Sequence, residues 1–260
     1  MKRGILLVAF GAGNARSADT LRRMQALTAE RFRLPARWAF TSDTLRERLA
    51  LARTKSDSVL KALRRMRYER YTHVAVQSLH LIPGQEYSAV LDDVRLAEAE
   101  GALRLTVGEP LLRDAADADE AARALLSHLP PARLSGEPVV CMAHGTRRDA
   151  KRLYECWGEA VARLDPNVYV ACMKGRVTLD SLLPLLKSRA GERVWLLPLL
   201  SVVGKHTLQD MAGDGPQSWK HRLEQAGFVC SADLRGLADG PFFAELWMRR
   251  LDKAVSALDA

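Results

Sequence analysis

The stretch from Val194 to His206 constrains the fold most, because a continuous apolar run ends at Gly204 and a lone imidazole follows two residues later. The run is too apolar and too short for a surface helix, so it predicts a strand that is buried on both faces. Open α/β sheets bind ligands just beyond the carboxyl ends of such strands. We therefore expect His206 to lie at a ligand site.

A second stretch, from Val74 to Glu86, has the same layout, with an apolar run, then Gly84, and then Glu86 two residues later. When Gly84 is aligned with Gly204, a carboxylate in the first half of the chain corresponds to the imidazole of His206 in the second half. This correspondence suggests two facing lobes that share one site.

A second repeat points the same way. An apolar strand-like run ends in Phe10-Gly11 in the first half and in His144-Gly145 in the second half. Either repeat alone is at the level of chance, but both occur in the same order in the two halves. Together they predict a pseudo-symmetric α/β protein of two lobes with an active-site cleft between them.

Strand-like runs alternate with amphipathic helical stretches along the chain, which is typical of parallel sheets flanked by helices. We predict strands at 4–10, 74–79, 104–107, 138–143, 168–173 and 194–202. We predict helices at 18–32, 44–52, 56–69, 85–99, 114–128, 147–163, 179–190, 217–226 and 241–258. A Pro-rich linker at 129–137 would separate an N-terminal lobe, 1–128, from a C-terminal lobe, 138–260. For the last helix, 241–258, packing back on the N-terminal lobe is an alternative to packing within the C-terminal lobe.

The charge balance favours an anionic ligand. The chain carries 39 Lys and Arg against 31 Asp and Glu, a net charge of +8. Solvated helix faces account for most of the excess, and the rest favours an anionic ligand or weak polyanion binding. Because the sequence has no nucleic-acid motif, we expect no specific nucleic-acid partner. The oligomeric state stays open, a homo-oligomer included.

The N-terminus and the cysteines bear on the location of the protein. Two basic residues precede a short apolar run that fits a first core strand better than a signal peptide, and no run approaches the ~20 apolar residues of a membrane span. The cysteines, Cys141, Cys156, Cys172 and Cys230, form no CxxC pair. This usage is typical of a reducing compartment. We expect a cytoplasmic protein without disulfides, with Cys141 and Cys172 buried in strands.

His144, His206 and Glu86 are the candidate metal ligands. Two imidazoles and a carboxylate suit a divalent first-row metal and leave coordination positions open. Each side chain also has a structural interpretation. His144 would pack at a strand end, His206 would lie in a loop, and Glu86 would be favoured by the positive end of a helix. For His144 we favour function, because Gly145 allows another group to approach the backbone closely.

The remaining histidines give weaker signals. His80 lies in a strand-like run and either packs in the core or faces the cleft. His73, His128 and His221 have charged or helix-end surroundings, so we expect them at the surface.

A glycine-rich turn, Gly11-Ala-Gly-Asn14, follows the first predicted strand. It resembles a phosphate-binding turn at a helix N-terminus, but the full GxGxxG motif and the P-loop motif are both missing. We therefore expect no nucleotide.

With these residues the chain resembles the anaerobic cobaltochelatases of the CbiK type, class II chelatases that insert Co²⁺ into sirohydrochlorin or its precorrin precursor. The matching motifs keep their order over nearly the whole chain. They are Phe40-Thr-Ser42, Gln77-Ser-Leu-His80, Gly84-x-Glu86-Tyr87, His144-Gly145, Leu197-Pro-Leu199, Gly204-x-His206, Asp210-Met-Ala-Gly-Asp214, Ser218-Trp219-Lys220 and Gly236-Leu237. The resemblance implies a bilobal α/β fold and a metal held by His144, His206 and Glu86.

The resemblance also implies an activity. It is the ATP-independent insertion of a divalent metal, cobalt ahead of iron or nickel, into sirohydrochlorin or a related tetrapyrrole in cobalamin biosynthesis. The metal is a substrate, and an unprotonated imidazole at His144 is a suitable acceptor for the pyrrole protons near pH 7.

The macrocycle is edged by carboxylates, so cationic side chains are expected to bind it. The candidates are Arg147, Arg148, Lys174 and Lys205, for which a solvated surface position is the alternative. The other expected substrate contacts are Phe10, Gly11, Ala12, His80 and Gly145.

Four departures from the family pattern involve five residues. A Thr-Ser pair after the first strand is replaced by Ala12-Gly13, the acid of a Val-Glu-Gly motif by Lys174, and the acids before Glu86 and His206 by Gln85 and Lys205. Three of these changes remove negative charge beside the expected metal site. Added positive charge opposes binding of a divalent ion and favours a polyanionic macrocycle. The alternative function is therefore a tetrapyrrole- or metal-binding carrier on the chelatase scaffold, and general polyanion binding ranks last.

Overall fold

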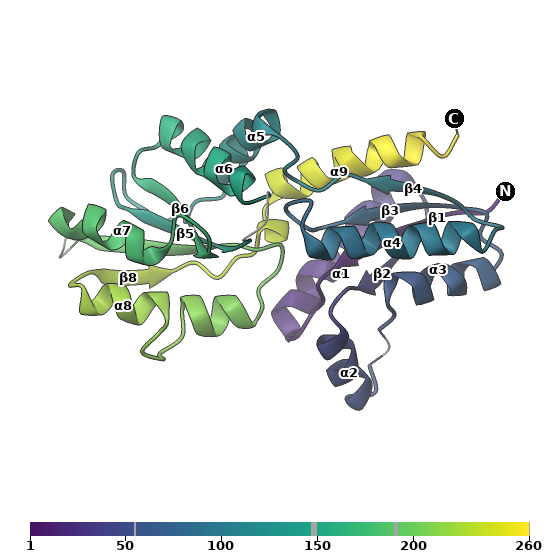
Figure 1. Ribbon diagram of the computed structural model, residues 1–260, viewed down its shortest axis with the longest axis horizontal. Coiled ribbons are helices and arrows are strands. Elements are labelled where there is room, and N and C mark those ends of the chain that lie inside the picture. Colours follow the sequence, from purple (N-terminus) through teal and green to yellow (C-terminus); the bar gives the residue numbers. More distant parts are fainter. Residues whose placement is uncertain (55, 147–149, 190–191, 260) are drawn as a thin grey trace. The chain divides into compact units, whose positions relative to one another are not determined.

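The computed structural model describes residues 1–54, 56–146, 150–189 and 192–259. The chain forms two compact units, one of Met1–Leu111 with Ala244–Ala260 and the other of Leu112–Phe243. Each unit contains one four-stranded parallel sheet with helices packed on it (Figure 1). Arg147 and Arg148, two of the expected cationic contacts, lie outside the described residues.

The sheet of the first unit has the strand order β2-β1-β3-β4, and all neighbouring strands are parallel. Its strands are β1 (Arg3–Ala9), β2 (Ala36–Phe40), β3 (His73–Ser78) and β4 (Arg104–Gly108). Its helices are α1 (Ala15–Phe32), α2 (Asp43–Leu51), α3 (Val59–Tyr68), α4 (Gln85–Ala99) and most of α9 (Pro241–Ser256).

The sheet of the second unit has the order β6-β5-β7-β8 and is also parallel throughout. Its strands are β5 (Val139–Gly145), β6 (Val168–Lys174), β7 (Arg193–Leu199) and β8 (Val229–Ala232). Its α-helices are α5 (Ala115–Leu126), α6 (Lys151–Leu164), α7 (Leu179–Leu186) and α8 (Trp219–Gln225). The short helices are η1 (Lys187–Arg189), η3 (Leu237–Asp239) and a π-helix, η2 (His206–Met211).

The two sheets share one topology. In each, the second strand along the chain lies at one edge, followed by the first, the third and the fourth. This confirms the predicted α/β class and the two pseudo-symmetric lobes. Because the strands of each sheet are parallel, their carboxyl ends lie at one edge, and the loops that carry the candidate residues follow these ends.

Burial of the central strands explains why their sequences are continuous apolar runs. In β1, Ile5, Leu6, Leu7 and Val8 are all fully buried, as expected for a parallel strand that is covered on both faces. Helices α3 and α4 contribute to the core on one face of this sheet. In the second unit, α7 and α8 join β5, β6 and β7 in a comparable core.

The predicted strands and helices are found, with shifted ends. The strand predicted at 194–202 ends at Leu199, and the helix predicted at 147–163 begins at Lys151. Two strands were not predicted, β2 and β8. Both are edge strands and only partly buried, so they lack the apolar run by which the other strands were recognised.

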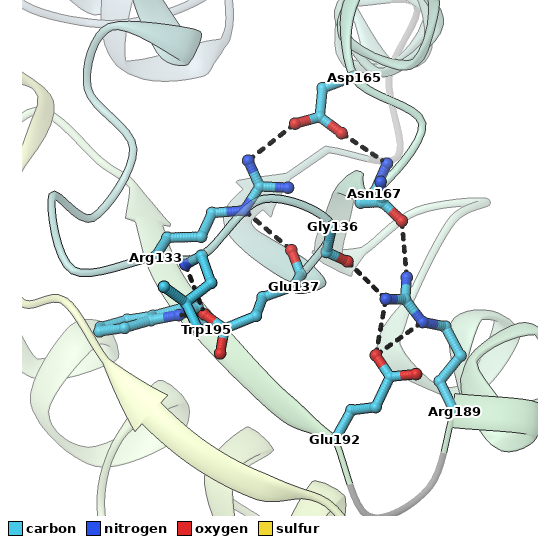
Figure 2. Close-up of polar contacts among 9 residues, drawn as sticks. Arg133, Gly136, Glu137, Asp165, Asn167, Arg189, Glu192 and Trp195 are labelled. Atoms are coloured by element: carbon cyan, nitrogen blue, oxygen red, sulfur yellow. Dashed lines mark hydrogen bonds and ion pairs between the residues drawn. The ribbon is translucent and has the colours of Figure 1, made fainter.

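The division into units differs from the predicted boundaries. Segment 129–137 and α5 both belong to the second unit, where α5 packs against α6. Within the segment, the Arg133 side chain donates hydrogen bonds to the Asp165 carboxylate, at 2.7 Å, and to the Glu137 carbonyl, at 2.8 Å (Figure 2). The Glu137 carboxylate in turn accepts a hydrogen bond from Trp195 Nε1 at 2.7 Å. These contacts tie the segment to the second sheet.

Helix α9 carries the end of the chain to the first unit. The Thr106 hydroxyl in β4 donates to the Ala254 carbonyl at 2.7 Å, and Arg3 Nη2 donates to the Val255 carbonyl at 3.2 Å. Arg31 on α1 forms an ion pair with Glu245 at 2.6 Å. Across the described ranges, no helix has both the length and the apolar character needed to cross a membrane.

Candidate functional site

The second unit brings His144 and His206 into contact. His144 is the penultimate residue of β5, and His206 begins η2 after the loop that leaves β7. Their rings meet edge to face, with centroids 5.2 Å apart and an interplanar angle of 63°. Neighbouring parallel strands, β5 and β7, therefore present two imidazoles at one sheet edge. The two candidate metal ligands that the sequence places in the second half of the chain therefore lie side by side.

Hydrogen bonds fix which ring nitrogen of each histidine carries the proton. His206 Nδ1 lies 2.6 Å from Asp210 Oδ2, and His144 Nδ1 lies 3.1 Å from the Gly145 carbonyl oxygen. A carboxylate and a carbonyl can only accept, so both Nδ1 atoms donate. In the neutral rings the Nε2 lone pairs are then available to a metal or a proton.

Asp210 is the partner of His206, a pairing that the sequence analysis did not propose, although Asp210 stands in one of the matching motifs. It lies four residues after His206 in η2, and both side chains are partly exposed, at 40% and 42%. A histidine that ligates a metal commonly donates its other ring nitrogen to such a carboxylate. The signal in the sequence is the His-x-x-x-Asp spacing, which places both side chains on one face of a helix.

Gly145 has a structural role. Its φ is +74°, and a Cβ at this position would lie 2.0 Å from the Lys174 carbonyl oxygen. Gly145 and Lys174 are paired in the register of β5 and β6. The close approach that we expected at this glycine is therefore made by the neighbouring strand. A contact of Gly145 with substrate stays a prediction.

Lys174 and Lys205 lie beside the histidine pair. Lys174 ends β6 and is exposed, and Lys205 immediately precedes His206 and is exposed too. Neither lysine forms an ion pair with a residue that the structure describes. Both positive charges are thus available to an anion at the edge that carries the imidazoles.

In the first unit, Phe10, Gly11 and Ala12 follow β1. Phe10 is 53% exposed, which is unusual for a large aromatic side chain and offers an apolar surface to a flat ligand. Gly11 has a φ of +145°, and a Cβ there would lie 2.2 Å from Leu45 Cδ2. The absence of a side chain at Gly11 leaves room for Leu45 of α2. Ala12 is half-buried.

Glu86 lies in the first turn of α4, just after the N-cap residue Gly84. Its side chain is half-buried and has no hydrogen bond or ion pair to the described residues. The positive end of the helix stabilises a carboxylate here without any ligand, so both interpretations of Glu86 remain. Glu86 belongs to the first unit and the histidines to the second. A three-ligand site stays a prediction.

Within the described parts of the chain, no group of three or more His, Cys, Asp or Glu side chains is arranged to hold a metal. What the second unit offers is two imidazoles with one carboxylate behind them. Such a set leaves coordination positions open, which suits a metal that must arrive and leave.

His80 is enclosed. Its Nδ1 lies 2.5 Å from the Ser78 hydroxyl, and its Nε2 is buried without a partner among the described residues. Burial lowers the pKa of His80 to about 4, so the ring is neutral at pH 7. The residue as a whole is half-buried, and a contact of His80 with substrate stays a prediction.

Two further expectations are decided by burial. His128 was expected at the surface, which is wrong, because it is 2% exposed and stacks edge to face on Phe243 with centroids 5.7 Å apart. Cys141 and Cys172 are buried, as predicted, and all four cysteines are free. Burial raises the pKa of Cys172 to about 11, so this thiol stays protonated.

Comparisons with known proteins show the family of the chain. A family model described as Cobalt chelatase (CbiK) matches residues 3–256. The chain is 51% identical, over 260 residues, to sirohydrochlorin cobaltochelatase CbiKC of Nitratidesulfovibrio vulgaris, with 99% of this chain and 92% of that protein covered. It is 32% identical, over 200 residues, to the sirohydrochlorin cobaltochelatase of Salmonella typhimurium, with 77% and 75% covered.

Solved structures show the same fold. SirB from Bacillus subtilis with Fe³⁺ superposes with a TM-score of 0.69 at 15% identity, covering 99% of this chain and 97% of that chain. SirB from Bacillus subtilis subspecies spizizenii in complex with cobalt gives a TM-score of 0.66 at 14% identity, covering 98% and 96%. At these identities the likeness extends to the fold alone.

Proposed function

The chain belongs to the cobalt chelatase (CbiK) family, and we propose that it inserts a divalent metal, cobalt first, into sirohydrochlorin or a closely related tetrapyrrole. The observation that carries this proposal is the pair of imidazoles, His144 and His206, whose Nδ1 atoms are both engaged while both Nε2 atoms are available. Iron and nickel are the other candidate metals, because nitrogen and oxygen ligands accept several divalent ions.

The two histidines would serve both metal and macrocycle. Insertion of M²⁺ replaces two pyrrole protons, so two protons must leave as the metal enters. Once the metal has moved from His144 Nε2 to the ring nitrogens, this neutral imidazole can accept one of them near pH 7, and the second proton passes to solvent water. Asp210 holds His206 in the tautomer whose Nε2 binds the metal. Glu86 is our candidate for a third ligand, and no nucleotide takes part in the reaction.

The flanking lysines act on the two substrates in opposite directions. Lys174 and Lys205 repel a divalent metal and attract the carboxylates of the macrocycle. We propose that both lysines bind the macrocycle, together with the exposed ring of Phe10. Their repulsion also weakens metal binding, which facilitates transfer of the metal to the ring nitrogens.

An anaerobic absorbance assay with sirohydrochlorin tests this function. Wild type should insert Co²⁺, His144→Ala should slow insertion at least about 100-fold, and Asp210→Asn should slow it about 10- to 100-fold. The matched control is Asp180→Asn, whose exposed carboxylate pairs with Arg222 instead of a histidine, and it should insert cobalt at the wild-type rate.

The alternative function is a carrier that binds the tetrapyrrole without inserting metal. It is favoured by the two lysines beside the histidines, which oppose metal binding. The same assay separates the two functions when it is repeated with Fe²⁺ and Ni²⁺. Tight binding of sirohydrochlorin with no insertion of any of the three metals would establish the carrier and refute the chelatase.

A further inference from the structure

Two adjoining cavities run along β6, the edge strand of the second sheet. The outer cavity has a volume of about 460 Å³. It is lined by Thr146, Lys151, Met173, Lys174, Gly175, Arg176 and Thr178. The inner cavity, of about 360 Å³, shares several of these residues and continues between α6 and β6.

The outer cavity is strongly basic. Its lining holds three cationic side chains, Lys151, Lys174 and Arg176, and no acid. The two lysines form no ion pair with any residue in the described ranges. Arg176 is 81% exposed, and its guanidinium lies 3.9 Å from the Glu155 carboxylate, so that pair is weak. The lining therefore carries positive charge that the neighbouring side chains leave uncompensated.

The inner cavity limits how deep an anion can bind. Glu155 and Glu159 on α6 line it together with apolar residues such as Val170 and Leu182. A second negative charge is unfavourable beside these carboxylates. An anionic group is therefore held in the outer cavity, against Lys151, Lys174 and Arg176. Lys151 is also the first residue of α6, where the positive end of the helix adds to the attraction.

The outer cavity opens beside the histidine pair. Lys174 is paired in register with Gly145, the residue after His144, and Thr146 lines the cavity two residues after His144. Adjacent strands are about 5 Å apart. A side arm of a flat ligand centred on His144 and His206 is thus within reach of the cavity.

We propose that the outer cavity binds a peripheral carboxylate arm of the macrocycle and so selects carboxylate-rich tetrapyrroles. This inference rests on the proposed function, because it takes the tetrapyrrole as the ligand of the histidine pair. Lys151 and Arg176 are thereby assigned to substrate recognition alongside Lys174. Selection at this cavity then depends on the number of carboxylates that the ring carries.

The test compares two metal-free macrocycles, uroporphyrin, which is rich in carboxylates, and mesoporphyrin, which has few. Their dissociation constants are measured by quenching of tryptophan fluorescence at fixed ionic strength. The triple variant Lys151→Gln, Lys174→Gln, Arg176→Gln should bind uroporphyrin about tenfold more weakly than wild type. Its affinity for mesoporphyrin should change by less than about twofold.

A second triple variant, Lys187→Gln, Arg193→Gln, Lys220→Gln, removes the same charge elsewhere on this unit and should bind both porphyrins as wild type does. Equal affinity of wild type and the cavity variant for uroporphyrin would overturn the proposal, as would equal weakening for both porphyrins. Inorganic phosphate is titrated in parallel. If phosphate binds wild type tightly and the cavity substitutions leave the affinity for uroporphyrin unchanged, the cavity binds a free anion and the proposal fails.

The readout is independent of catalysis, since no metal is present. Failure of wild type to insert cobalt into sirohydrochlorin would refute the proposed function and leave this binding comparison intact. Conversely, if wild type inserts cobalt and the cavity variant binds uroporphyrin as tightly as wild type, the cavity and the proposed role of Lys174 are refuted, and the proposed metal insertion stands.

Discussion

At the end of β5, the backbone of Gly145 combines a φ of +74° with a Cβ position only 2.0 Å from the Lys174 carbonyl oxygen. A side chain there costs about 1–2 kcal/mol for the left-handed conformation, and the clash with a backbone atom adds to this cost. Gly145→Ala should therefore lower the free energy of unfolding by about 3 kcal/mol, measured by urea denaturation. The strain falls next to His144, so this variant should also bind metal poorly.

Gly136→Ala is the control for that variant. Gly136 has a φ of +87°, and a Cβ there meets nothing within 4 Å. Its substitution should cost only the conformational part, about 1 kcal/mol. Equal losses of stability in the two variants would show that the approach of β6 to Gly145 is not what excludes a side chain.

His80 makes stability depend on pH, because burial lowers its pKa to about 4 while the unfolded chain keeps a value of about 6.5. Between these values the unfolded state binds a proton that the folded state does not. The free energy of unfolding should therefore fall as the pH drops from about 6.5 to about 4, by roughly 3 kcal/mol in total. At pH 7 and above, this contribution is fully retained.

Urea denaturation of wild type and His80→Gln at several pH values measures the contribution of His80 to the free energy of unfolding. As the pH falls from about 6.5 to about 4, wild type should lose more unfolding free energy than His80→Gln, because the variant has no imidazole at this position to protonate. An NMR titration of the His80 ring gives a direct check. A ring that titrates near pH 6.5 in the folded protein would contradict the enclosed, neutral state.

The candidate site also shows which residues a sequence reveals. His144 and His206 were recognisable because each follows an apolar run, and strand ends are where ligands bind. Asp210 was not, because an aspartate in a polar stretch has many explanations, and only the folded η2 places it 2.6 Å from the His206 ring. His128 was misplaced at the surface, since its contact with Phe243 joins residues far apart in the chain.

At the scale of elements, predictability followed burial. Strands β1, β3, β5 and β7 are internal strands, and their apolar runs predicted them to within a few residues. Of the four edge strands, β4 and β6 were predicted as well, whereas β2 and β8, which are only partly buried, were not. The π-helix η2 was not predicted from the sequence.

The segment before β5 is fastened to the amino-terminal ends of the second sheet (Figure 2). Arg133 is its anchor, with a side chain that is 10% exposed and an ion pair to Asp165 at 2.7 Å. Arg133→Met removes this pair and leaves a partly buried carboxylate without its cation. The free energy of unfolding should fall by about 2 kcal/mol, as measured by urea denaturation.

Arg163→Met provides the comparison for the anchor. Arg163 pairs with Asp119 at the surface, with exposed fractions of 62% and 50%, so its loss should cost less than about 0.5 kcal/mol. If both arginine variants were equally stable, the segment would not depend on Arg133. Arg189 holds the same segment independently through the Gly136 carbonyl and Asn167, so we expect a lowered stability rather than an unfolded protein.

At the scale of the whole molecule, the duplication was visible in the sequence but the boundary was not. The repeated strand-glycine pattern predicted two pseudo-symmetric lobes, and the two sheets do share one strand order. A Pro-rich segment is a reasonable place to divide a chain, yet the first unit is completed by α9, and the second unit begins before α5. Contacts such as that of Thr106 with Ala254 join distant parts of the sequence, and local composition carries no trace of them.

The duplication makes one prediction about the whole molecule, that Glu86 of the first unit ligates the same metal as His144 and His206 of the second. Glu86→Gln should weaken Co²⁺ binding to the macrocycle-free protein about tenfold or more, measured by calorimetry. Asp92→Asn, an exposed carboxylate on the same helix, should not. Ligands of one ion are energetically coupled, so in a His144→Ala background the Glu86→Gln change should lose at least about 1 kcal/mol of its effect. An effect of Glu86→Gln that is the same with and without His144 would mean that the carboxylate acts elsewhere, and that the repeat reflects a shared fold but not a shared metal site.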